Sequence, residues 1–136
     1  MVKLIMGLKG SGKTKTLVDL VIKAVADENG DVVCIEKDKN LTYDIPYTAR
    51  LIHASEYGIN TNNLLRGFIC GLHAGNYDIT HVFIDNFYKL LDDSSPEAVA
   101  DMLDWMEDFS KANSINFTIT ATDDVEKASD RIKRYF

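Results

Sequence analysis

The sequence lacks several features that would place it outside ordinary globular proteins. Its 136 residues include two prolines, eight glycines and two cysteines, which excludes collagen-like and low-complexity chains. No apolar run approaches the roughly 20 residues of a transmembrane helix, and residues 1–7 contain no apolar stretch long enough for a secretory signal. The two cysteines, Cys34 and Cys70, form no CxxC pair. We therefore expect a single domain, residues 1–136, in the reducing cytoplasm and not at a membrane.

The charge is acidic and unevenly distributed. The 21 Asp and Glu residues outnumber 15 Lys and Arg, giving a net charge of −6. This balance disfavours nucleic acid as the main partner, because a phosphate backbone attracts positive surfaces. Residues 85–110 contain eight acidic residues and one basic residue, Lys89, whereas residues 127–134 are basic. The two segments are either separate solvated helix faces or a docking pair, within the chain or between chains.

Apolar runs alternate with helical patterns along the chain. The runs predict buried strands near residues 2–6, 32–35, 50–53, 81–85 and 115–121. The apolar spacing between them predicts helices near residues 13–28, 62–74 and 94–109, with a short last helix in 123–134. Alternating strands and helices, with strands apolar on both faces, are typical of a parallel sheet covered by helices. The predicted fold is α/β: a three-layer α/β/α sandwich around a mainly parallel five-stranded sheet.

Two glycines, Gly67 and Gly71, interrupt the helix predicted over 62–74, and Gly75 just after it continues their spacing of four residues. Each lowers helix propensity by about 1 kcal/mol relative to alanine, so their repetition needs a reason. We expect this face to pack closely against the sheet. Cys70 is expected on the core face of the same helix, and Cys34 in a strand core.

The clearest chemical signal lies in Gly7–Thr14, with the sequence GLKGSGKT. It matches G-x-x-x-x-G-K-[ST] and stands between a predicted strand and a predicted helix. Glycines let a tight loop turn its N–H groups toward phosphate, and the helix start adds the positive end of its dipole. Lys13 is expected on the β- and γ-phosphates, and the Thr14 hydroxyl on Mg²⁺. The expected phosphate-binding residues are Gly7, Leu8, Lys9, Gly10, Ser11, Gly12, Lys13, Thr14 and Lys15.

This loop resembles the Walker A motif of the P-loop NTPases, and residues 1–121 are similar in element order to the RecA-like branch of that superfamily. The run His81–Asp85 resembles a Walker B strand. The resemblance implies that Asp85 holds Mg²⁺ through a water and pairs with Thr14. It also implies that the last strand lies between the Walker B strand and the first strand.

The resemblance suggests roles for residues at two further strand ends. RecA-like ATPases carry a water-polarising glutamate at the end of the second strand, where this chain has Glu36. The alternative for Glu36 is a solvated carboxylate paired with a nearby lysine, Lys37 or Lys39. A polar residue ending the last strand, Thr120 or Thr122, would sense the γ-phosphate. The alternative is an ordinary threonine of a strand.

These features predict a protein that binds Mg-ATP and slowly hydrolyses the β–γ bond, with Lys13, Glu36 and Asp85 as catalytic residues. No [NT]-K-x-D guanine motif occurs, so ATP is favoured over GTP. One alternative is a nucleotide-dependent switch without significant turnover, which Asn86 directly after Asp85 favours. A small-molecule kinase is a second alternative. A nucleic-acid motor is a third, and the acidic charge argues against it.

Fast hydrolysis would require an arginine near the phosphates, and the motif contains none. The candidates are Arg131 and Arg134, or an arginine supplied by a protein partner or a neighbouring subunit of a homo-oligomer.

Overall fold

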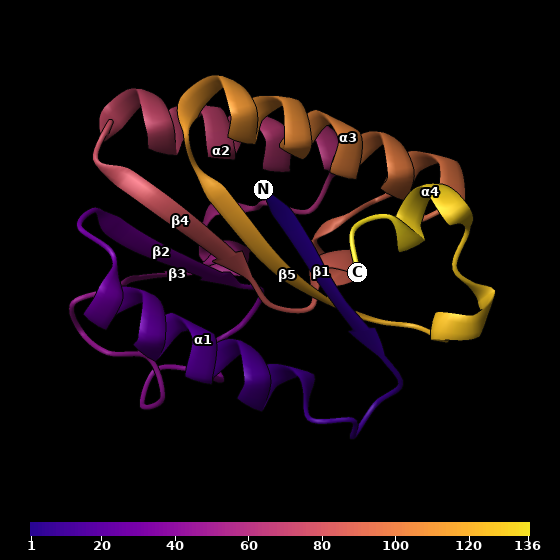
Figure 1. Cartoon of the computed structure of the whole chain (residues 1–136), viewed down its shortest axis with the longest axis horizontal. Coiled ribbons are helices and arrows are strands. Elements are labelled where there is room, and N and C mark those ends of the chain that lie inside the picture. Colours follow the sequence, from indigo (N-terminus) through magenta and orange to yellow (C-terminus); the bar gives the residue numbers. More distant parts are fainter.

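A computed structural model describes residues 1–136 and shows a five-stranded sheet between two layers of helices (Figure 1). The strands are β1 (Val2–Gly7), β2 (Asp31–Glu36), β3 (Arg50–His53), β4 (Ile79–Ile84) and β5 (Asn116–Thr122). The helices are α1 (Lys13–Asp27), α2 (Asn62–Gly75), α3 (Pro96–Asn113) and α4 (Asp130–Lys133). Short 3-10 turns occupy Ala54–Tyr57, Phe87–Leu90 and Val125–Lys127. None of the helices combines the length and the apolar character needed to cross a membrane.

The strand order is β1-β5-β4-β2-β3, and every neighbouring pair is parallel. The predicted α/β class is confirmed, and the sheet is wholly parallel. The strand β5 lies between β1 and β4, as expected. Because all strands point the same way, the loops that follow them meet at one edge of the sheet, where ligands bind in open α/β folds. The segments after β1, β4 and β5 are therefore neighbours.

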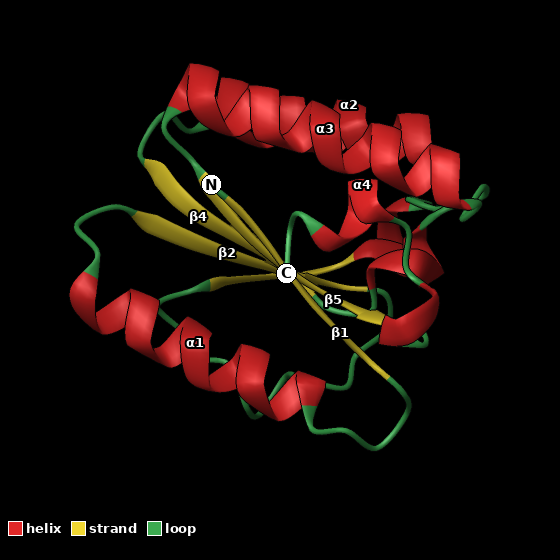
Figure 2. Cartoon of the chain, turned by 45° about the vertical axis from the view of Figure 1, so that its right-hand side comes forward, coloured by secondary structure: helices red, strands yellow, loops and turns green.

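Helix α1 covers one face of the sheet, and α2 and α3 cover the other (Figure 2). The larger buried cluster lies under α2 and α3 and includes Phe87 and Phe117. The smaller cluster lies under α1 and includes Leu41 and Ile45, from the segment that joins β2 to β3. That crossover therefore completes the α1 layer without forming a helix of its own.

The glycines of α2 do not pack against the sheet, so that expectation is wrong. Leu65 and Ile69 face the core, and Gly67 and Gly71, two residues further on, lie about 200° around the helix and are exposed. A Cβ atom built at either glycine meets nothing within 4 Å. Cys70 is also exposed, contrary to expectation, whereas Cys34 is buried as expected.

Because both sites are open, replacing Gly67 and Gly71 with alanine should stabilise the protein. Each substitution should raise the free energy of unfolding by about 0.5–1 kcal/mol, since alanine restricts the unfolded chain and favours the helix. Urea unfolding of the two single variants and the double variant tests this. A loss of stability in the double variant would mean that this face is covered in solution.

The basic segment docks on the acidic helix within the chain. Arg131 Nη2 lies 2.9 Å from Asp101 Oδ1 and 2.8 Å from Asp104 Oδ2, and the Tyr135 hydroxyl donates to Asp104. The backbone N–H of Leu4 in β1 donates to the carbonyl of Tyr135 at 2.7 Å. The two oppositely charged segments are thus a docking pair within the chain, and Arg131 supplies the ion pairs between them.

A partly buried histidine, His81, links the end of α1 to β4 and β5. His81 Nδ1 lies 2.9 Å from Glu28 Oε2, and His81 Nε2 lies 2.8 Å from Thr118 Oγ1. The ring stacks on Phe83 with 4.0 Å between ring centroids. Burial lowers the pKa of His81 from its usual 6.5, against the opposing effect of the Glu28 carboxylate.

Acidification should therefore destabilise the fold through His81. The unfolded chain binds the His81 proton more readily than the folded chain, so this contribution to stability is present above pH 6.5 and is lost as the pH falls below it. Urea unfolding at about pH 7.5 and about pH 5.5 measures the loss, which should be smaller in His81→Gln. An equal loss in the variant would assign the pH dependence to other groups.

Candidate functional site

The loop after β1 turns on two glycines with left-handed backbone. Gly10 has φ 84° and Gly12 has φ 83°, a region in which other residues are strained. A Cβ at Gly7 would come within 2.6 Å of Ser11 Oγ. Steric constraints therefore favour glycine at all three positions. At Gly10 and Gly12 the constraint is the positive φ, and at Gly7 it is the close approach of Ser11.

Lys13 is the first residue of α1, yet it is one of six buried polar or charged residues. Its ammonium donates to the Leu8 carbonyl at 3.0 Å and to Ser11 Oγ at 3.3 Å. These partners are neutral, so no carboxylate cancels the Lys13 charge. The ammonium links the end of the glycine loop to its beginning, and its charge remains available to an anion.

Asp85 directly follows β4 and is buried beside the start of α1. The Thr14 hydroxyl lies 3.3 Å from Asp85 Oδ1 and 3.2 Å from Asp85 Oδ2. The Thr120 hydroxyl donates to Asp85 Oδ1 at 2.6 Å, and the backbone N–H of Asp85 donates to the Ile35 carbonyl at 2.9 Å. Residues 71 positions apart in the sequence, Thr14 and Asp85, thus form one oxygen-rich cluster.

The next residue, Asn86, has a strained backbone. Its φ is 54°, one of only two positive values outside glycine. Its N–H donates to Thr120 Oγ1 at 2.9 Å, and its side-chain amide lies 3.4 Å from Asp85 Oδ2. Such conformations persist where surrounding contacts fix them, and they concentrate at functional sites.

The two candidate threonines of β5 have different positions. Thr120 is fully buried and supports Asp85 and Asn86 from beneath. Thr122, two residues further along the strand, lines a hollow of about 420 Å³ next to the glycine loop. Of the two, Thr122 is the one that can face a ligand.

That hollow, which we call the lysine hollow, is lined by four lysines and no carboxylate. This is unusual in a chain of net charge −6. Six of the predicted loop residues contribute to it, and Asn86 and Lys89 were not predicted. Lys89 is the only basic residue of segment 85–110, and this isolation in an acidic segment was the only feature of the sequence that set it apart. The lining residues are Lys9, Gly10, Gly12, Lys13, Thr14, Lys15, Asn86, Lys89 and Thr122.

Glu36 is buried at the end of β2, and its carboxylate serves the loop that follows. Oε1 accepts from the N–H of Asn40 at 2.8 Å, and both oxygens accept from the N–H of Leu41 at 3.1–3.2 Å. His53 Nδ1 lies 3.3 Å from Oε2. Glu36 does not line the lysine hollow. Lys39 pairs with Glu56 instead, so Glu36 is also not the solvated carboxylate of the alternative interpretation.

The buried cysteine of β2 is chemically quiet. Burial raises the pKa of the Cys34 thiol well above its usual range, and the Asp85 and Glu36 carboxylates raise it further. The thiol stays protonated at neutral pH, which makes it a poor nucleophile.

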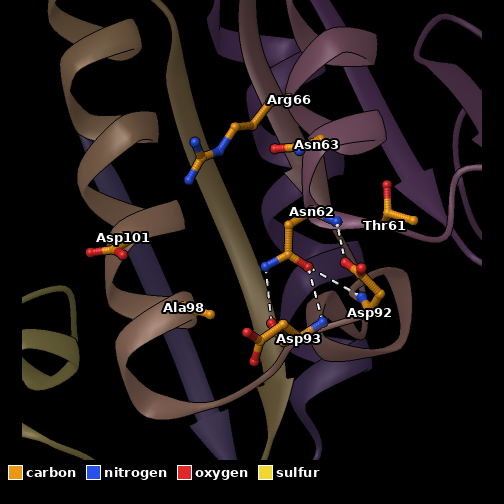
Figure 3. Close-up of a pocket in the computed structure, with 8 residues that line it drawn as sticks. All are labelled: Thr61, Asn62, Asn63, Arg66, Asp92, Asp93, Ala98 and Asp101. Atoms are coloured by element: carbon orange, nitrogen blue, oxygen red, sulfur yellow. Dashed lines mark hydrogen bonds between the residues drawn. The ribbon is translucent and has the colours of Figure 1, made fainter.

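A second hollow, of about 450 Å³, lies between the starts of α2 and α3 (Figure 3). Asn62 joins its two sides: its N–H donates to Asp92 Oδ1 and its side-chain amide to the Asp93 carbonyl, both at 2.9 Å. Asp92, Asp93 and Asp101 line this hollow with Arg66, and these carboxylates would repel phosphate. The hydrogen bonds of Asn62 hold the start of α2 against the segment before α3, so this hollow has a structural role. Nowhere in the chain do three His, Cys, Asp or Glu side chains gather to hold a metal ion.

Comparison of the sequence with models of known protein families and with curated proteins finds no match.

Proposed function

We propose that this chain is a P-loop nucleotide-binding protein that binds Mg-ATP in the lysine hollow. The observation that carries the proposal is the conjunction of the glycine loop, the unpaired charge of Lys13 and the contact of Thr14 with the buried Asp85. The loop supplies N–H groups and the start of α1 for phosphate. The resemblance of Gly7–Thr14 and His81–Asp85 to Walker motifs agrees with this assignment.

The oxygen donors of Thr14, which lines the hollow, and of Asp85, which lies against Thr14, fit Mg²⁺. Thr14 offers a hydroxyl and Asp85 a carboxylate, and Mg²⁺ prefers such oxygen ligands together with waters and substrate phosphates. Thr14 would hold the ion directly and Asp85 through a water. Bound there, Mg²⁺ would neutralise charge on the β- and γ-phosphates.

Slow turnover fits the site better than fast turnover. No carboxylate lines the hollow to orient an attacking water, because Asn86 follows Asp85 and Glu36 is held by Asn40 and Leu41. Glu36 can act as a base only after release from those N–H groups. A nucleotide-dependent switch is the second candidate, and this same lack of a free carboxylate favours it.

A calorimetric titration of the wild-type protein with Mg-ATP, Mg-ADP and adenosine tests the proposal. Saturable heat with both nucleotides and none with adenosine is expected, because the site recognises the phosphate chain. Continuing heat after saturation, with release of inorganic phosphate, would establish the ATPase. Binding that ends cleanly would establish the switch. No binding at millimolar nucleotide would overturn the proposed function.

A further inference from the structure

None of the chain's four arginines faces the lysine hollow. Arg66 donates to Met102 Sδ at 3.1 Å, and its guanidinium lies 5.8 Å from the centre of the Trp105 ring. Arg131 is held by two carboxylates of α3. The remaining two are Arg50, at the start of β3, and Arg134, over the Tyr135 ring. A cation for the end of the phosphate chain, if supplied in the same chain, must be a lysine.

Lys89 has the position and the free charge for this task. It lines the lysine hollow, its side chain is exposed, and no carboxylate lies within ion-pair distance of it. The other three lysines of the hollow come from the glycine loop and the first residues of α1. Lys89 alone comes from the segment after β4.

The turn that carries Lys89 is firmly anchored. Phe87 and Leu90, on either side of it, are fully buried. The N–H of Lys89 donates to the Asn86 carbonyl at 3.0 Å, and Asn86 is itself bonded to Thr120. The Lys89 backbone is therefore held in a fixed relation to the Asp85 cluster.

Lys89 borders the lysine hollow on the side of the segments that follow β4 and β5. Lys89, Asn86 and Thr122 also line an adjoining hollow of about 190 Å³, which the glycine loop does not reach. These three residues thus border the lysine hollow on the side of the β4 and β5 ends. Phosphates gripped by the loop and α1 would extend toward them.

Resting on the proposed function, we propose that Lys89 is a specificity residue that contacts the terminal phosphate and makes the site prefer a nucleoside triphosphate to a diphosphate. A diphosphate held by the loop would end short of Lys89. The side chain would then contribute to binding only when a third phosphate is present.

The test is calorimetry of Lys89→Gln and Lys89→Arg with Mg-ADP and with the Mg complex of the non-hydrolysable β,γ-imido analogue of ATP. Lys3→Gln is the matched control, because Lys3 is an exposed lysine near the opposite end of β1. Loss of one charged contact should weaken analogue binding about tenfold in Lys89→Gln and leave ADP binding within about twofold. Lys89→Arg should retain the preference, and Lys3→Gln should match wild type.

Two results would overturn the role of Lys89 while leaving the proposed function intact. One is an equal loss of affinity for the analogue and for ADP, which would make Lys89 a general source of positive field. The other is no change for either nucleotide. Failure of the wild type to bind both nucleotides would instead remove the proposed function, and the inference with it. Thermal unfolding of each variant checks that the fold is retained.

Discussion

Replacing Lys13 with alanine should weaken Mg-ATP binding by at least about 100-fold, because in the proposed site it removes a desolvated cation that would contact the phosphates. The ammonium is buried and has only neutral partners, the Leu8 carbonyl and the Ser11 hydroxyl. Its full charge is therefore available to a ligand, and it is the one buried lysine among the four that line the hollow. Isothermal titration calorimetry on the variant measures the loss.

The matched control for this experiment is Lys23→Ala. Lys23 lies on the same helix, α1, but is exposed and does not line the lysine hollow. Its replacement should leave the dissociation constant within about twofold, since an exposed charge outside the site contributes little. Wild-type affinity in Lys13→Ala would show that nucleotide binds elsewhere.

Replacing Phe87 with alanine should lower the free energy of unfolding by about 3–5 kcal/mol, the usual cost of emptying a fully buried phenylalanine site. Phe87 has 0% exposure and directly follows Asn86. Its loss leaves a cavity beneath the turn that positions Lys89, so the variant should also show weaker nucleotide binding. Urea unfolding gives the first quantity and calorimetry the second.

Phe136→Ala provides a control of the same residue type. Phe136 is 38% exposed, and its replacement should cost less than about 1 kcal/mol. A similar small cost at Phe87 would mean that the turn after β4 refills the cavity, and that its anchoring is weaker than its burial indicates.

The framework of this fold was predictable because continuous apolar runs have few alternatives to buried strands. The run Val32–Ile35 and the run before Asp85 both form strands of the predicted type. The glycine loop was equally predictable, because the spacing of its glycines, lysine and threonine is a local property of the sequence. Its contact with Asp85 was implied by the resemblance of His81–Asp85 to a Walker B strand, and in the structure both lie where parallel strands end at one edge.

The contacts of Glu36 were not predictable, because they depend on an irregular segment. The segment 37–49 has no periodic pattern, and its path is set by the burial of Leu41 and Ile45 under α1. Only that path brings the N–H groups of Asn40 and Leu41 to the carboxylate. The strain at Asn86 was likewise invisible, since a sequence does not report φ.

The division of roles between Thr120 and Thr122 illustrates a different limit. Thr120 and Thr122 are two residues apart at the end of β5, so the alternation of side chains along a strand places both on the same side of the sheet. They differ in their distance along the strand from the carboxyl edge of the sheet. Thr120 lies beside Asp85 and contacts it, whereas Thr122 lies two residues further on and lines the hollow. This difference depends on how far the neighbouring strands extend, and the sequence of one strand does not determine that.

The hydrogen bond from Leu4 to Tyr135 also affects how molecules of this protein meet one another. An uncovered strand at the border of a sheet invites a second chain to pair with it, which is a route to aggregation. At β1 this route is obstructed, because the carbonyl of the buried Tyr135 accepts the hydrogen bond of the Leu4 N–H. The opposite border, β3, has only four residues and begins with a charged Arg50. Both edge strands of the sheet are thus protected against edge-to-edge association.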